Sequence, residues 1–129
     1  MDLGALDGTD GFAISGIDAG DFSGWSVSGA GDVNGDGVGD VIIGANGANS
    51  MAGESYVVFG KDVASNGGFA ANVSLGSLTG ADGFVINGFA AGDRAGSSVS
   101  NVGDLNGDGV DDVIVGAVTA TPNLSLIHI

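Results

Sequence analysis

Short runs of apolar, mostly β-branched residues alternate with glycine-rich polar segments along this chain. The continuous runs Val41–Ile43 and Val113–Val115 are typical of strands that are covered on both faces. In Trp25–Ser28 and Ser98–Ser100 apolar positions alternate with serine, as in half-buried strands, and Ser55–Phe59 is rich in strand-forming residues. No window combines helical periodicity with capping residues. We therefore predict an all-β fold.

The whole pattern repeats at an offset of 72 residues. When residues 10–45 are aligned with 82–117, 24 of the 36 positions are identical. The brief apolar segments Phe12–Ile14 and Phe84–Ile86 occupy matching places in the two copies. A long fixed period indicates a repeat architecture whose unit is one supersecondary element. We expect a four-stranded antiparallel sheet per unit, stacked on its neighbours because a sheet with two apolar faces cannot bury both alone.

The strand order divides the chain into one complete unit and parts of others. We assign residues 1–21 to the last strand of a preceding unit, 22–88 to the complete unit, 89–120 to the first half of the next, and 121–129 to a non-repeat tail. We interpret the tail as read-through sequence rather than native protein. In the variable connection 61–80, we expect Leu75 and Leu78 to pack against the sheet edge.

Composition narrows the classes of partner. The 129 residues include 16 acidic residues, 15 of them Asp, against two basic ones, which gives a formal charge of −14. Like-charge repulsion argues against nucleic acid and anionic membranes as partners. With no Cys, there is neither a disulfide nor a catalytic thiol. No apolar stretch is long enough to span a membrane, and the first residues do not form a signal peptide.

The most informative motif is Asp-x-Asn-Gly-Asp-Gly-x-x-Asp, which occurs at 32–40 and again at 104–112. Oxygen-bearing side chains at positions 1, 3, 5 and 9 of a tight loop suit calcium, which takes 6–8 oxygen ligands. Without metal, each pair of carboxylates about 5 Å apart would cost roughly 3 kcal/mol at an effective dielectric constant of about 20. The alternative is a pair of metal-free Asn-Gly and Asp-Gly hairpin turns. An EF-hand is excluded because Ile43 or Val115 stands where its Glu is required.

Together, GDVNGDGVGDVIIGA, SYVVFGK and GDLNGDGVDDVIVGA resemble the FG-GAP repeats of integrin-α-type β-propellers and their bacterial relatives, over about residues 10–117. The resemblance implies a propeller of seven four-stranded blades, with calcium bound between the first and second strands of a blade. Fewer than two blades are present here. Asn46 and Val118 replace the proline that follows Gly-Ala in the family.

The resemblance also implies a ligand set for about two calcium ions. In the first loop the ligands would be Asp32, Asn34, Asp36, Asp40 and the carbonyl of Val38. In the second loop they would be Asp104, Asn106, Asp108, Asp112 and the carbonyl of Val110. Asp111 lies between ligand positions, and we expect it to point to solvent.

The implied function is that of a calcium-binding module of an extracellular or cell-surface protein. It would serve as a structural or adhesion scaffold, with a protein or carbohydrate ligand bound by the full propeller. The alternatives are the non-catalytic propeller portion of a secreted hydrolase such as a phospholipase D-like enzyme, and a passive stalk in a large bacterial surface protein. We predict no catalytic residue, since the only His, His128, lies in the tail and no nucleophile motif occurs. We expect Trp25 to pack in the core or between blades.

Overall fold

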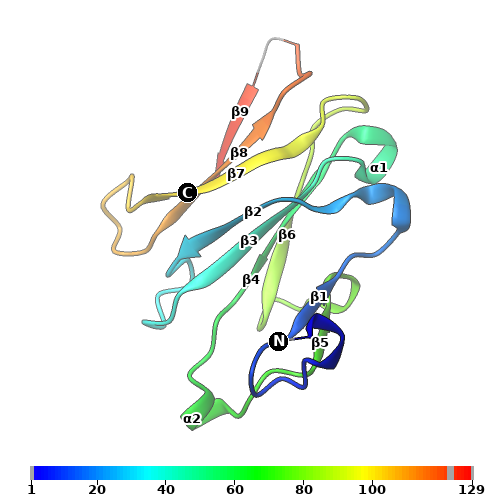
Figure 1. The fold of residues 1–129 in the computed structure, drawn as a ribbon. Helices are drawn as coiled ribbons and strands as arrows, with labels where there is room; N and C mark the ends of the chain where they lie inside the picture. The colour runs from blue at the N-terminus through cyan, green and yellow to red at the C-terminus, as the bar shows by residue number, and fades with distance from the viewer. Residues whose placement is uncertain (1, 122–123, 129) are drawn as a thin grey trace.

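The computed structural model describes residues 2–121 and the backbone of 124–128, and strands dominate it (Figure 1). The elements, in chain order, are η1 (Leu3–Ala5), β1 (Ala13–Ser15), η2 (Ala19–Asp21), β2 (Ser23–Gly31), β3 (Asp40–Ala45), α1 (Ala48–Met51), β4 (Glu54–Val58), α2 (Val63–Asn66), β5 (Asn72–Ser74), η3 (Leu75–Ser77), β6 (Gly83–Asn87), β7 (Ala95–Gly103), β8 (Asp112–Ala117) and β9 (Leu124–His128). Each α-helix is a single turn. The predicted all-β class is confirmed.

The complete unit is a four-stranded antiparallel sheet in the order β2-β3-β4-β6. The strand register is regular from Val41 opposite Val58 to Ala45 opposite Glu54. β2 is longer than the predicted segment Trp25–Ser28, because flanking Ser and Gly residues also pair with β3. The predicted antiparallel blade is therefore present, with the first acidic loop between its first two strands.

The second sheet repeats this arrangement in the order β7-β8-β9. β7 and β8 pair antiparallel with register shifts between Ala95 and Ser98 and between Asn101 and Gly103, each 72 residues after the equivalent shift in β2. The sequence predicts two strands for this unit, and the structure adds β9, which pairs antiparallel with β8. Any extended segment can satisfy the open amides and carbonyls of a strand edge. The rest of the tail, 122–123 and 129, lies outside the described residues.

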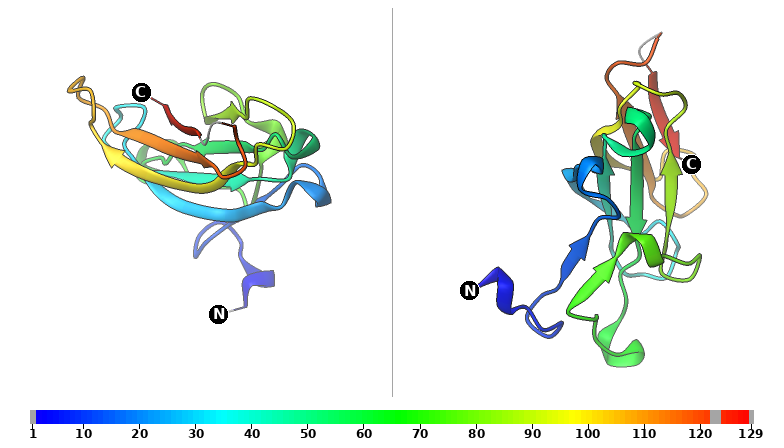
Figure 2. Two further views of the ribbon diagram at one scale, coloured as in Figure 1. Left: turned by 90° about the horizontal axis from the view of Figure 1, so that it is seen from above. Right: turned by 90° about the vertical axis from the view of Figure 1, so that its right-hand side faces the viewer.

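The two sheets stack face to face and share one apolar core (Figure 2). Its buried members are Ala30, Ile42, Val57, Ala95, Val113, Val115, Ala117 and Ala120. Small residues let the backbones approach closely, and Gly53 even forms an isolated parallel bridge with Ala95. The Ser26 hydroxyl donates to the Gly96 carbonyl across the same interface, at 2.8 Å. Stacking therefore covers the face that one sheet could not bury alone.

The opposite face of the first sheet is covered by a small arm in which β1 pairs parallel with β5 (Figure 2). This arm and the following turn bury a second cluster around Tyr56 and Val58. Leu75 is only 3% exposed there, and Leu78 packs against the cluster, so both leucines contact the sheet as expected, but on its face rather than at its edge. β1, which the sequence assigns to a preceding unit, here pairs with the 61–80 connection instead.

Three apolar side chains are more exposed than their patterns predict. Trp25 is 62% exposed and contacts Phe22 edge to face, with ring centroids 6.2 Å apart. The expectation that Trp25 packs in the core or between blades is therefore wrong for this chain. Val41 is 37% exposed, although its neighbours on β3 are buried. Val27, which the pattern places in a half-buried strand, is 67% exposed. None of the described helices is long and apolar enough to cross a membrane.

Candidate metal centre

The first acidic loop connects β2 to β3 and folds around the carboxylate of Asp32. This carboxylate accepts hydrogen bonds from the backbone amides of Gly35 at 2.7 Å, Asp36 at 3.0 Å and Gly37 at 2.8 Å. The two glycines have positive φ angles of 76° and 83°, which side-chain-bearing residues rarely adopt. Asp32 thus holds the turn closed, and the glycines make the turn sterically accessible.

The next two oxygen-bearing positions contact each other. The Asn34 amide donates to the Asp36 carboxylate at 3.0 Å, and the Asn34 side-chain oxygen accepts from the Asp36 amide at 3.1 Å. The other Asp36 oxygen accepts from the amide of Val38 at 2.8 Å. Asn34, Asp36 and the backbone amide of Val38 are therefore brought together, whereas the predicted ligand from Val38 is its carbonyl.

The second loop reproduces this geometry in the next sheet. Asp104 accepts from Gly107, Asp108 and Gly109, and Asp108 accepts from Val110 and from the Asn106 side chain, with distances of 2.7–3.0 Å. The backbone amide of Val110 lowers the pKa of Asp108, and the Asn106 side chain adds to this effect. The predicted site residues thus form two matching sets, one per blade.

The ninth position of each loop is a buried carboxylate at the start of a strand. Asp40 is 3% exposed and Asp112 is 1% exposed. Asp40 accepts from the amides of Val33 and Gly60, both at 2.8 Å, and Asp112 accepts from the amide of Leu105 at 2.7 Å. A buried carboxylate needs such partners because losing water is costly for a charged group.

Burial raises the pKa of Asp40 above its ordinary value of 3.8. Hydrogen bonds from Gly60 and Val33 oppose the rise, whereas the charges of Asp36 and Asp32 add to it. The negative potential of the loop is therefore felt at its buried end. A cation beside these carboxylates would offset that negative potential and favour the charged form of Asp40.

The donor chemistry fits a hard cation such as calcium, because the predicted ligand positions of each loop offer three carboxylates, one amide oxygen and a backbone carbonyl. In the described part of the chain, no three acidic or histidine side chains are grouped as a formed metal site. Instead, the acids of each loop bind loop amides. A carboxylate oxygen has two lone pairs, so it can accept an amide and still bind a cation. The structure thus shows loops that their own acids pre-organise.

Two contacts at the loops were missed from the sequence. Gly60 donates to Asp40 from the end of β4, and a Cβ there would lie 2.2 Å from the carbonyl oxygen of Gly39. The Phe59-Gly60 pair was the available signal. Asp111, expected to face solvent, instead accepts a hydrogen bond from the amide of Asp32 at 3.0 Å, so that expectation is wrong.

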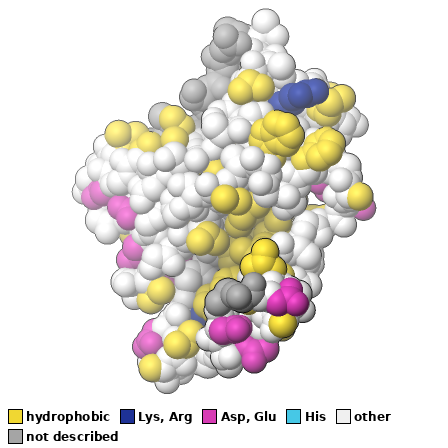
Figure 3. Space-filling model, in the orientation of Figure 1, with side chains coloured by type: hydrophobic (Ala, Val, Ile, Leu, Met, Phe, Trp, Pro, Cys, Tyr) yellow, Lys and Arg dark blue, Asp and Glu magenta, His cyan; other side chains and the backbone are white. Residues whose placement is uncertain are grey.

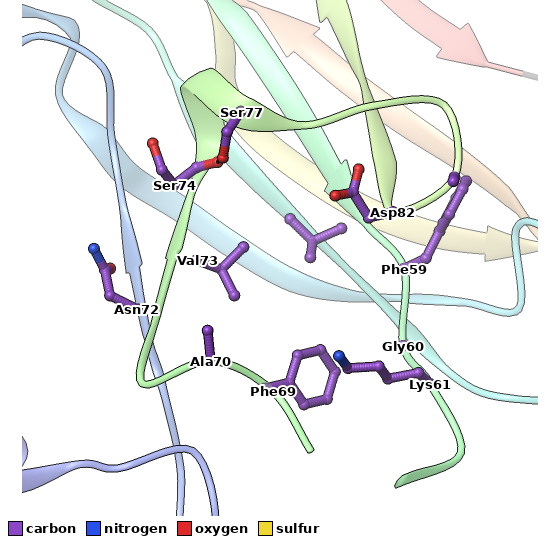
Figure 4. A pocket seen from close by; sticks show the side chains of 12 residues that line it. Phe59, Gly60, Lys61, Phe69, Ala70, Asn72, Val73, Ser74, Ser77 and Asp82 are labelled. Carbon is purple, nitrogen blue, oxygen red and sulfur yellow. The ribbon is translucent and has the colours of Figure 1, made fainter. Parts of the chain in front are cut away.

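A separate cavity of about 290 Å³ lies between β4 and the 69–82 segment (Figure 4). Its only ionisable side chains are Lys61 and Asp82. The Lys61 amine lies over the Phe69 ring, 4.6 Å from its centroid, and the Asp82 carboxylate accepts from the Thr79 amide and hydroxyl. Both side chains therefore have structural partners within the connection.

Stacked antiparallel sheets, each with an acidic loop between its first two strands, define a repeat of the β-propeller class. The sequence model of the FG-GAP repeat family matches residues 23–58 and 95–121, which begin with β2 and β7 and contain both loops. The chain therefore carries FG-GAP repeats, and FG-GAP repeats are propeller blades. They are typically non-catalytic structural modules and occur in extracellular or surface proteins. No curated protein matches the chain significantly.

Proposed function

We propose that this chain is a calcium-stabilised blade module of an extracellular or cell-surface β-propeller that serves as an adhesion scaffold. The observation that carries the proposal is the duplicated loop. The same carboxylate contacts recur in both loops, at the same place in successive sheets. Loops that served only as turns would not need three acids each, because Asn-Gly and Asp-Gly turns form without them.

Calcium would act by stabilising the loops that join the first and second strands. Each loop concentrates like charges, and each contains one carboxylate that is almost fully buried. If a site had a Kd near 10⁻⁵ M and free calcium were about 10⁻³ M, binding would stabilise the fold by roughly 2.7 kcal/mol per site. Such stabilisation matters in a chain with a formal charge of −14, where self-repulsion opposes the compact state.

Calorimetry tests this proposal. We expect 1 mM calcium to raise Tm by on the order of 10 °C or more, and magnesium to act more weakly because it demands a stricter octahedral shell. The double variant Asp36→Ala/Asp108→Ala should lose the calcium-dependent shift. Asp10→Ala/Asp62→Ala, which removes two exposed acids outside the loops, should keep it. Unchanged calcium binding in the loop variant would refute the ligand assignment, and a wild-type chain that does not respond to calcium would refute the function.

A scaffold also needs a surface for its partner, and we propose that this surface lies at the end of the blades opposite the acidic loops. A cavity of about 290 Å³ there is lined by Phe22, Trp25, Asn46, Gly47, Met51 and Arg94. Exposed hydrophobic side chains gather around a basic side chain over the α1 end of the molecule (Figure 3). Aromatic residues, Met and Arg are the residue types enriched in protein interfaces.

Residues with a strained backbone lie at the same surface, which favours its assignment as the partner site. Five non-glycine residues in the described chain have positive φ angles, and all lie at this end, within α1 or in the adjoining loops: Phe22, Asn49, Ser50, Met51 and Arg94. Three of them line the cavity. Left-handed backbone at such residues costs of order 1–3 kcal/mol each and clusters at functional sites. The Arg94 guanidinium, one of two basic groups in an acidic chain, favours a partner that presents a carboxylate.

Trp25 is the only Trp, so its fluorescence reports on this cavity directly. We expect short, otherwise uncharged peptides with a free terminal carboxylate to shift the Trp25 emission, and amidated or basic peptides of equal length to leave it unchanged. Arg94→Gln should remove the response, whereas Lys61→Gln, the matched change at the other basic residue, should preserve it. A response that survives Arg94→Gln would contradict the proposed carboxylate contact.

A further inference from the structure

Asp111 joins the second acidic loop to the first one across the interface between the two blades. Its backbone amide donates to the carbonyl of Asp32 at 2.9 Å, and its carboxylate accepts from the amide of Asp32 at 3.0 Å. A single residue thus binds both backbone polar groups of a residue 79 positions away. This pair of bonds is defined here as the clasp.

The backbone around the clasp is shaped to let the two loops approach. Gly31, which precedes Asp32, has a φ of +76°, and a Cβ there would lie 2.0 Å from the Asp111 carboxylate. A Cβ on Gly35 would lie 3.1 Å from a methyl group of Val110 in the second loop. Glycine at these positions therefore removes the side chains that would separate the loops.

The clasp reaches the first loop through its central acid. The backbone that Asp111 holds belongs to Asp32, whose carboxylate binds the three amides that close the first loop. On the other side, Asp111 directly precedes Asp112, the buried carboxylate of the second loop. The clasp therefore links the two loops through the peptide units next to Asp32 and Asp111.

The connection is directional along the chain. The residue equivalent to Asp111 in the first loop is Gly39, which has no carboxylate to offer. Its carbonyl instead lies against Gly60 of its own blade. The second loop therefore supplies the carboxylate of the clasp, and the first loop has no equivalent carboxylate at position 39.

From this geometry we infer that Asp111 couples the two acidic loops, so that a cation bound in one loop strengthens cation binding in the other. The inference rests on the proposed calcium function. Cation binding at the second loop fixes the backbone of Asp111. The fixed Asp111 holds the backbone of Asp32 in place, and its carboxylate brings an additional negative charge toward the first loop. Coupling between sites is reciprocal, so each cation raises the affinity for the other by the same factor.

Single-loop backgrounds measure this coupling by calcium calorimetry on the full chain. Asp108→Ala disables the second loop and reports the affinity of the first loop alone. We expect the first loop to bind calcium about fivefold more weakly in that background than in the wild-type chain. Asp111→Gly copies the first-loop sequence. When it is added to the wild-type chain and to the Asp108→Ala chain, the two should bind calcium at the first loop with equal affinity. Asp111→Asn keeps an acceptor oxygen without the charge and should retain part of the difference. A fivefold difference that persists in Asp111→Gly would overturn the coupling.

Amide hydrogen exchange without calcium tests the clasp independently of the metal. We expect the Asp32 amide to exchange at least tenfold faster in Asp111→Gly, and to stay protected in Asp111→Asn and in the charge control Asp10→Asn. Unchanged protection in Asp111→Gly would overturn the clasp. If the wild-type chain bound no calcium, the proposed function and the coupling would both fail, whereas the exchange result would still decide whether the clasp exists.

Discussion

Several glycines of this chain stand where a side chain would collide with a neighbouring segment. A Cβ on Gly44 would lie 2.1 Å from the carbonyl oxygen of Gly96 in the adjacent blade, and 2.4 Å from the Ser26 hydroxyl. By contrast, a Cβ on Gly29 would meet nothing within 4 Å. Composition alone indicates many tight turns. Only the structure separates the glycines that permit blade stacking from those that are exchangeable.

We predict that Gly44→Ala lowers the unfolding free energy by about 1–3 kcal/mol, because the added methyl group forces the two sheets apart. Gly29→Ala is the matched control on the neighbouring strand and should change stability by no more than about 0.5 kcal/mol. Chemical denaturation of both variants measures the difference. Equal stabilities would show that the interface relaxes around the methyl group without cost.

At the scale of elements, the blade was predictable and the connection was not. Alternation with serine and continuous β-branched runs correctly indicated the first two strands of each unit. Nothing in the sequence indicated that β1 pairs with β5. Each strand has only three residues, and their pairing depends on how the connection folds over the first sheet. Within the connection, the apolar character of Leu75 did predict its contact with the blade.

We predict that Leu75→Ala costs about 2–5 kcal/mol of unfolding free energy, the usual range for a truncated core leucine. Leu75 is almost fully buried against the outer face of the first sheet, whereas Leu3 is 78% exposed. Leu3→Ala should therefore change stability by less than about 0.5 kcal/mol. Thermal unfolding of both variants provides the test. A small effect of Leu75→Ala would mean that the connection does not stabilise the blade.

At the scale of the whole molecule, the distribution of acids makes stability depend on pH. The pKa of Asp40 is raised by burial, so the folded state binds its proton more tightly than the unfolded state does. The charged form of Asp40 therefore destabilises the fold, and this destabilisation is relieved as the pH falls from neutral toward the raised pKa of Asp40. Asp7, Asp62 and Asp108 have lowered pKa values, and their stabilising contributions are lost only below about pH 3.8.

We therefore predict that the calcium-free chain gains thermal stability as the pH is lowered from 7 toward the raised pKa of Asp40, and loses it again below about 3.8. Protonation of other carboxylates also reduces the repulsion within a chain whose formal charge is −14. This effect likewise raises stability as the pH falls toward 3.8. Calorimetry after removal of calcium on a chelating resin measures Tm across this range. A Tm that falls steadily from pH 7 downward would contradict the sign derived from Asp40.

The sequence by itself determined the repeat, the antiparallel blade and the position of the acidic loops, because strand periodicity and turn chemistry are local properties. It also indicated the residues of each loop that contact one another, since Asp32, Asn34 and Asp36 lie within five positions. Tertiary structure alone decided that Asp111 binds the neighbouring loop, that Trp25 is exposed and that Gly44 is sterically required. Those properties depend on which surface of one blade covers another, and residues some 50 to 80 positions apart meet only when the sheets stack.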